Sequence, residues 1–306
     1  MGTVRQLRLD PGAVTLEEAA GAYLATLDHD ESRQTARAYR STLKGLRAEF
    51  GDGAALGELT EAAVADWFAR RWRDAAPATS NRHRVAIRSA FRYWGEQGWL
   101  PAGQLAGTLK RRKVPADRAR ALSRADIGQL LGREDVALRE KALWRMLYES
   151  AARAHEVLAL DVGDLDLANR KAKVRRKGGA ADIITWQTGT ARLLPRLLKG
   201  RKQGPVFITD RRARVALPPC DLDPASGRAR LSYRHAEALF KAASGGATLH
   251  QLRHSALTHA AEEGASTSTL LAYSGHTSVA SLARYARVSP EALARWQAQR
   301  DPARRR

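Results

Sequence analysis

The sequence has a single cysteine and no long apolar run. Cys220 alone excludes an intrachain disulfide and any zinc site built from cysteines. No stretch approaches the roughly 18 consecutive apolar residues that a membrane span needs. Residues 1–14 lack the apolar segment of a signal peptide, and no internal repeat is visible. These absences predict a cytoplasmic protein without a membrane partner.

Acidic residues are also few. The chain has 32 Asp plus Glu against 52 Lys plus Arg, a formal net charge of +20. Such a field attracts polyanions, because each phosphate neutralised by a basic side chain releases counterions. A soluble basic protein or a membrane-surface binder would share this charge, but no isolated basic amphipathic segment favours the membrane. We therefore expect contact with nucleic acid and association with the nucleoid.

The first part of the chain has the pattern of an all-helical unit. A chain of 306 residues, 44% of them apolar, suits two domains with a core each. The capping-box pattern that begins at Thr15 predicts a helix to about Leu27. Further helices are predicted over 32–50, 60–72 and 79–94.

Two of these helices carry a basic face beside an apolar one. A basic helix face is usually just solvated. Two such faces on a strongly cationic protein favour a DNA-facing surface. The predicted DNA contacts are Arg33, Arg37, Arg40 and Lys44 on the second helix, where Arg47 shares the face, and Arg84, Arg88 and Arg92 on the fourth.

Pro101 and Gly103 end this unit, and a basic segment follows. It is extended around Pro115 and has the composition of a linker between domains. Such a linker could track along a phosphate backbone, although the charge run alone fits a solvated connector equally well. The basic residues assigned here to DNA are Lys110, Arg111, Arg112 and Lys113.

The second domain is predicted to be mainly helical with one small antiparallel sheet. Ser123 and Asp126 form a helix cap, and a helix is expected over 136–152. Strands over 171–176 and 182–186 flank the turn at Lys177. Helices are then expected over 188–199, 233–243, 249–263 and 266–273, and from Ser278 onward.

Several polar residues of this domain have spacings that suit phosphate chemistry. His250 and Arg253 are three apart, so a helix displays them on one face. His254 is one turn from His250, but no further ligand set suggests a metal, and a structural role is expected for it. His276 follows Gly275, and the glycine break would let it meet Tyr285, which one uninterrupted helix would place on the opposite side.

Taken in order, these residues resemble the catalytic signature of tyrosine recombinases of the phage integrase type, with the simple architecture of the Xer-like members. The matching positions are Arg153-x-x-Glu156, Lys177 in a hairpin, His250-x-x-Arg253, Gly275-His276 and Tyr285. Ser274 departs from the Leu common before Gly-His, and Ala151-Ala152 from the usual Gly-Leu. The resemblance implies a lead over 1–14, a helical core-binding (SAM-like) domain over 15–105, a basic linker over 106–121, a catalytic domain over 122–288, and a C-terminal helix and tail over 289–306.

The resemblance also implies the chemistry. Tyr285 would attack the scissile phosphate, form a 3′-phosphotyrosyl link and release a 5′-hydroxyl, so that no ATP is needed. Arg153 and Arg253 would clamp the phosphate, with His276 hydrogen-bonded to it. His250 would be the general base and Lys177, in a mobile hairpin, the general acid. Glu156 would support Arg153. No metal and no cofactor is expected.

The same residues leave alternatives open. A type IB topoisomerase shares the tyrosine chemistry, and a cleavage-inactive DNA-binding regulator could share the scaffold. The expected partners are double-stranded DNA and further copies of the chain, as a dimer on one site and a tetramer in synapsis. A paralogous recombinase or an accessory protein is a further expectation. The short lead favours a simple recombinase, for dimer resolution or for a mobile element, over integrases with an arm-binding domain.

Overall fold

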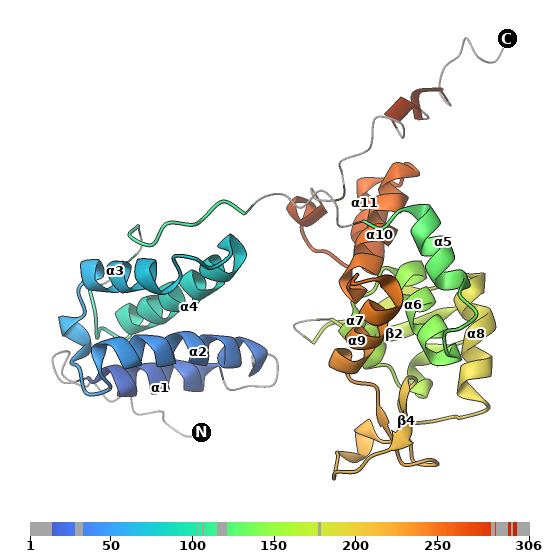
Figure 1. Cartoon of the computed structure of the whole chain (residues 1–306), viewed down its shortest axis with the longest axis horizontal. Helices are drawn as coiled ribbons and strands as arrows, with labels where there is room; N and C mark the ends of the chain where they lie inside the picture. The colour runs from blue at the N-terminus through green and yellow to red at the C-terminus, as the bar shows by residue number, and fades with distance from the viewer. Residues whose placement is uncertain are drawn as a thin grey trace. The chain divides into compact units, whose positions relative to one another are not determined.

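The computed structural model describes residues 14–27, 33–101, 103–105, 107–114, 121–176, 179–282, 285, 293–294 and 296–298, with the side chains of 33 and 34 left out. The chain divides into two compact units, Met1–Ala116 and Asp117–Arg306, each drawn in Figure 1. Helices dominate both units. Within the described residues, no helix combines the length and apolar character that a membrane crossing requires.

The described residues of the first unit form a bundle of four α-helices: α1 Leu16–Thr26, α2 Arg33–Phe50, α3 Glu61–Arg71 and α4 Pro77–Glu96. The capping box at Thr15 is present as predicted. Helix α4 begins two residues earlier than expected, because Pro77 occupies its first turn, where a missing N–H costs nothing. Apolar residues of α2 and α4 meet in the core, where Trp94 donates a 2.8 Å hydrogen bond to the Ala19 carbonyl.

The basic segment after this bundle is partly bound to it. The Arg112 backbone N–H donates to Asn81 Oδ1 on α4 at 2.8 Å, and Asn81 Nδ2 donates back to the Arg112 carbonyl at 2.8 Å. The Arg112 guanidinium donates to the carbonyls of Arg73 and Ala75. The predicted linker is therefore docked on the first unit at Arg112. Residues 115–120 lie outside the described part of the chain.

The second unit has the predicted helices and more β-structure than expected. Its elements are α5 Arg124–Gly132, α6 Leu138–Ser150, α7 Ala154–Leu158, β1 Leu165–Asp166, β2 Lys171–Arg175, β3 Ala181–Thr185, α8 Thr188–Leu198, β4 Ile208–Arg212, β5 Arg228–Arg230, α9 Tyr233–Ser244, α10 Leu249–Glu262 and α11 Thr267–Ser274. The core is built around α6, which packs against α8 and α10. The strands β1, β2 and β3 form one antiparallel sheet.

Two predictions for this unit need correction. The sequence predicted one sheet, but β4 and β5 form a second, two-stranded antiparallel sheet. Their arginine-rich sequence lacks the apolar alternation that identifies a half-buried strand. The helix predicted from Ser278 is instead a 3₁₀ turn over Val279–Leu282, and Tyr285 follows it with its N–H bonded to the Leu282 carbonyl at 2.8 Å.

Candidate active site

The turn between α6 and α7 places the first arginine of the site. Ala151 is the C-terminal cap of helix α6 and has a left-handed conformation with φ of +49°. Glycine adopts this conformation most easily, and an alanine there carries roughly 1 kcal/mol of strain. After this turn Arg153 becomes the N-terminal cap of α7. The departure from Gly at Ala151 therefore falls at a strained backbone position.

A buried carboxylate holds two arginines at this point. Glu156 Oε1 accepts from Arg153 at 2.9 Å, and its Oε2 accepts from Arg176 at 2.7 Å and from the Arg153 backbone N–H at 3.0 Å. The Glu156 side chain is fully buried, whereas that of Arg153 is 31% exposed. Burial by itself raises the pKa of Glu156, but the hydrogen bonds from Arg153 and the charge of Arg176 outweigh it and lower this pKa. The carboxylate thus stays charged and fixes Arg153 at the surface.

The second arginine, Arg253, comes from α10 and is almost completely buried. Its guanidinium donates to the Ala151 carbonyl, to the Ser274 carbonyl at 2.7 Å and, at 2.9 Å, contacts His276 Nε2. Burial and the nearby charge of Arg153 lower the pKa of Arg253, and Tyr285 opposes this shift. The resulting pKa is about 10. The side chain therefore joins the end of α6, the end of α11 and His276 at one point.

Tyr285 lies beside this arginine, and its ring is tilted against the rings of two histidines. Its ring centroid is 5.0 Å from that of His254 and 6.1 Å from that of His276, and the side chain is 2% exposed. Gly275 ends α11 with φ of +59°, a conformation that favours glycine. The predicted glycine break is confirmed in this sense: it turns the chain so that His276 and Tyr285 meet. His254 packs on Tyr285, in agreement with its expected structural role.

Arg176 is a residue of this site that the sequence did not reveal. Besides Glu156 it binds Asp182 across the base of the β2–β3 hairpin at 2.8 Å, and its side chain is 10% exposed. A Cβ at Gly275 would lie only 2.3 Å from the Arg176 guanidinium. Arg176 therefore joins the Arg153 loop, the hairpin base and the Gly275–His276 turn. Only its position next to Lys177 hinted at this, and the spacing of the known motifs did not include it.

His250 and Lys177 are the remaining predicted residues of the site. His250 is exposed on the first turn of α10, the helix that also carries Arg253. His155, beside Arg153, has its pKa lowered by burial and by the surrounding arginines, although Glu156 opposes this shift. Lys177 lies outside the described residues. Among the described residues, no three His, Cys, Asp or Glu side chains are grouped so that they could hold a metal ion.

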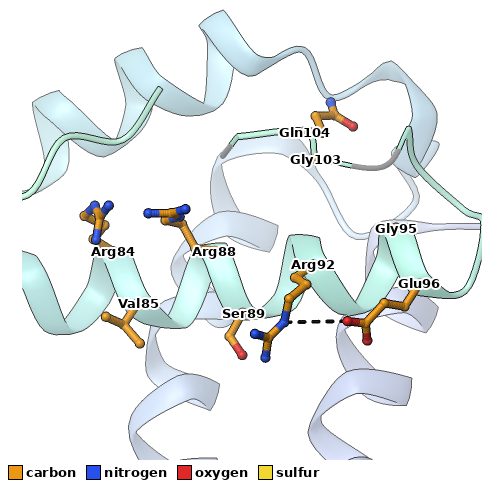
Figure 2. A pocket seen from close by; sticks show the side chains of 9 residues that line it. All are labelled: Arg84, Val85, Arg88, Ser89, Arg92, Gly95, Glu96, Gly103 and Gln104. Carbon is orange, nitrogen blue, oxygen red and sulfur yellow. Dashed lines mark ion pairs between the residues drawn. The ribbon is translucent and has the colours of Figure 1, made fainter. Parts of the chain in front are cut away.

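The first unit offers a candidate DNA-binding groove of about 590 Å³ along α4. Figure 2 shows Arg84 and Arg88 projecting from the same side of this helix, one turn apart. Arg84 donates to the Leu109 carbonyl, and Arg92 pairs with Glu96 at 3.7 Å. Arg88 is the third predicted contact on α4, and its side chain has no ion pair or hydrogen bond among the described contacts.

The predicted contacts on α2 and in the basic segment are mostly exposed. Arg47 differs, because it is paired with Glu17 and Asp52 within the unit. The side chain of Arg33 lies outside the described part. The exposed residues are Arg37, Arg40, Lys44, Lys110, Arg111 and Lys113.

Comparison with known proteins finds a matching family model and similar sequences. The phage integrase family model matches residues 120–292. The tyrosine recombinase XerC of Mycobacterium tuberculosis (strain ATCC 25177 / H37Ra) is 33% identical over 284 residues, which cover 87% of this chain and 92% of XerC. XerC of Mycobacterium sp. (strain KMS) is 30% identical over 291 residues, covering 89% and 93%.

Solved structures share the fold at lower sequence identity. The XerH site-specific recombinase bound to a palindromic difH substrate has a TM-score of 0.68 at 15% identity, covering 94% of this chain and 96% of that one. A lambda integrase dimer bound to a COC′ core site has a TM-score of 0.67 at 17% identity, covering 90% and 78%. Both similarities are similarities of fold.

Proposed function

This chain belongs to the phage integrase family of tyrosine recombinases and is an enzyme of site-specific DNA recombination, and we propose that it works through a covalent 3′-phosphotyrosyl intermediate on Tyr285. The observation that carries this proposal is the meeting of Tyr285, His276 and Arg253 at one buried point. These residues come from different segments, and a tyrosine attack on phosphate requires this combination of nucleophile, hydrogen-bond donor and fixed positive charge.

The proposed reaction balances without a cofactor. The Tyr285 hydroxyl oxygen bonds to the scissile phosphorus, the bond to the 5′-oxygen breaks, and the phosphotyrosyl ester keeps the energy of the phosphodiester. The 5′-hydroxyl of the strand cut in the partner site then attacks this ester and releases the tyrosine. Phosphoryl transfer depends on positioning and charge stabilisation more than on other covalent chemistry.

Each charged group has a role in this proposal. Arg153, held by Glu156 and partly exposed, contacts the non-bridging oxygens from the surface side. Arg253, fixed by three acceptors, stabilises the charge that develops at the buried side. A free tyrosine has a pKa of about 10, so its attack needs a base and nearby positive charge. We assign the base to His250 and the acid for the leaving 5′-oxygen to Lys177.

The burial of Tyr285 implies a further step. A side chain that is 2% exposed cannot reach a DNA phosphate until the residues packed around it move away. We propose that DNA binding uncovers Tyr285 and brings the β2–β3 hairpin with Lys177 to the phosphate. We further propose that a dimer binds one site through two half-sites and that two sites pair as a tetramer, with an accessory protein or a paralogue as an additional partner.

A nicked suicide substrate tests the proposal. The DNA site is first mapped by footprinting for an inverted repeat near the gene, and a nick is placed so that the cleaved strand loses its 5′-hydroxyl. We expect a covalent protein–DNA adduct with the native chain and none with Tyr285→Phe. Absence of an adduct with both proteins on the true site would indicate a binding regulator. Relaxation of plasmids that lack the site would indicate a topoisomerase.

A further inference from the structure

The β4–β5 hairpin is an arginine-rich projection that none of the catalytic roles uses. Figure 1 shows β4 at the edge of the second unit, beside the end that carries α7 and α9. The two strands, Ile208–Arg212 and Arg228–Arg230, are joined by residues 213–227. Val215 in this connection is 70% exposed. The hairpin leads within two residues into α9, so it is continuous with the body of the unit.

The base of the hairpin is rigidly bound to the chain that follows α7. Arg230 donates to the carbonyls of Leu158, Ala159 and Leu160, and it pairs with Asp161 and Asp221 at 2.8 Å each. The Leu231 N–H also bonds to the Phe207 carbonyl at 2.8 Å. Since Arg153 caps the other end of α7, the hairpin has a fixed position relative to the catalytic arginine.

The acidic residues of this hairpin are paired with arginines of the unit's framework. Asp210 binds Arg139 at 3.1 Å, and Asp223 binds Arg201 at 3.5 Å. Asp221 is bound by Arg230, as above. These ion pairs offset the acidic charges, and arginines remain in excess on the hairpin. Four arginines are exposed there, and no ion pair to them occurs among the described residues: Arg211, Arg212, Arg214 and Arg228.

Two of these arginines oppose each other across the strands. Arg212 and Arg228 are direct partners in the antiparallel register. Side chains of directly opposed residues point to the same face, and like charges in this arrangement destabilise a sheet. An anion between or beside the two guanidinium groups would remove the repulsion. Phosphate groups of a nucleic acid backbone suit a row of arginines, which bind them bidentately.

We propose that the β4–β5 hairpin is an additional DNA-backbone contact of the second unit, with Arg212 and Arg228 binding phosphate outside the cleavage site. The proposal rests on the proposed function in that duplex DNA is the ligand. The hairpin would contribute affinity and position the duplex over Arg153 without reading sequence, because phosphate contacts fix register and carry no base information.

The test compares two pairs of substitutions of equal charge in the full-length chain. Arg212→Gln with Arg228→Gln removes the opposed pair. Arg192→Gln with Arg196→Gln removes two exposed arginines of α8 as a matched control. Binding to a 30-base-pair duplex of arbitrary sequence is measured by fluorescence anisotropy over a range of NaCl concentrations. The slope of log K against log salt is expected to become shallower by about 1.8 for the hairpin pair, at about 0.9 per phosphate contact, and to stay unchanged for the control.

A second measurement separates a binding role from misfolding. Because the substitutions remove a repulsion, we expect the thermal midpoint of the hairpin variant to equal or exceed that of the native chain. Equal slopes for native and hairpin variant, or equal losses in both variants, would overturn the proposal. Weaker self-association with an unchanged slope would overturn it in favour of a protein contact. Adduct formation by the native chain on a nicked site reports on Tyr285 independently, so the two proposals can fail separately.

Discussion

Glu156 shows at the scale of single residues how the site is held together. Its carboxylate is fully buried and binds Arg153 and Arg176 at once. A buried charge with well-placed partners is stable, but removal of one member leaves the others uncompensated. Glu156 therefore contributes to folding and to the placement of Arg153 through the same contacts.

We expect Glu156→Gln to lower the free energy of unfolding by about 3 kcal/mol at pH 7, the size typical for a broken buried ion pair. The lowered pKa of Glu156 means that its contribution is complete above the unfolded value of about 4.3 and is lost as pH falls through the lower folded value. Urea denaturation from pH 7 down to pH 3 should show the difference from the native chain shrinking in acid. Glu134→Gln, at an exposed position, is the control, and a difference that grew in acid would refute the account.

Arg176 is expected to act on the rate of cleavage through position. Arg176→Met removes both ion pairs and loosens the hairpin base from the Gly275 turn. Displacements of about 1 Å near a reacting centre can cost about a hundredfold in rate. At saturating nicked DNA we expect adduct formation to slow by roughly ten- to a hundredfold with Arg176→Met and less with Arg176→Lys, which keeps the charge. Arg175→Met, at the exposed neighbour, should be neutral, and equal slowing at both positions would argue against a positioning role.

The candidate residues of the site could be chosen from the sequence, whereas the contacts between them could not be predicted from it. The order and spacing of Arg153, His250, Arg253, His276 and Tyr285 predict the proposed reaction, because phosphate transfer needs each of these chemical types. Arg176 and Glu156 are 20 residues apart in the sequence. Their ion pair depends on how β2 lies against α7, which periodicity does not report.

At the scale of elements, helices were predictable because apolar periodicity and caps mark them, and the N-terminal ends of α1 and α5 follow from their capping boxes. Three features escaped this reasoning. Helix α7 has five residues, too few for a periodic pattern. The strands β4 and β5 are rich in exposed arginine, and their pairing is long-range. The left-handed turn at Ala151 had no glycine to signal it.

Helix α4 leads to a prediction at this scale. Arg88 projects into the groove of the first unit, whereas the charge of Arg70 on α3 is paired with Glu49 at 2.8 Å. If α4 faces DNA, Arg88→Gln should make the slope of log K against log salt shallower by about 0.9. Arg70→Gln should leave the slope unchanged. Anisotropy titrations of both variants with the same duplex decide the point, and identical slopes would remove α4 from the DNA interface.

At the scale of the whole molecule, one chain brings Tyr285, His276 and Arg253 of the candidate site together. Tyr285 packs against His254 and His276 of its own chain, next to its own Arg253. The family membership, the basic surface and the division into two units agree with an enzyme that holds DNA. The number of chains that act together belongs to the proposal of paired half-sites.

Cleavage within one chain can be tested by mixing inactive proteins. Tyr285→Phe keeps the arginines, and Arg253→Ala keeps the tyrosine. We expect a mixture of the two on a nicked site to give no more adduct than either alone, because a chain that lacks Arg253 cannot activate its own Tyr285. Adduct formed only in the mixture would show that the tyrosine is donated to a neighbouring chain.

Tyr285 is the residue that we propose becomes covalently bound to DNA. The most direct measurement isolates the adduct formed on a nicked site, digests protein and DNA, and locates the attached nucleotide by mass spectrometry. We expect a 3′-phosphonucleotide on Tyr285 and on none of the other tyrosines among the seven in the chain. A nucleotide attached to a different residue, or an adduct that persists in Tyr285→Phe, would contradict it.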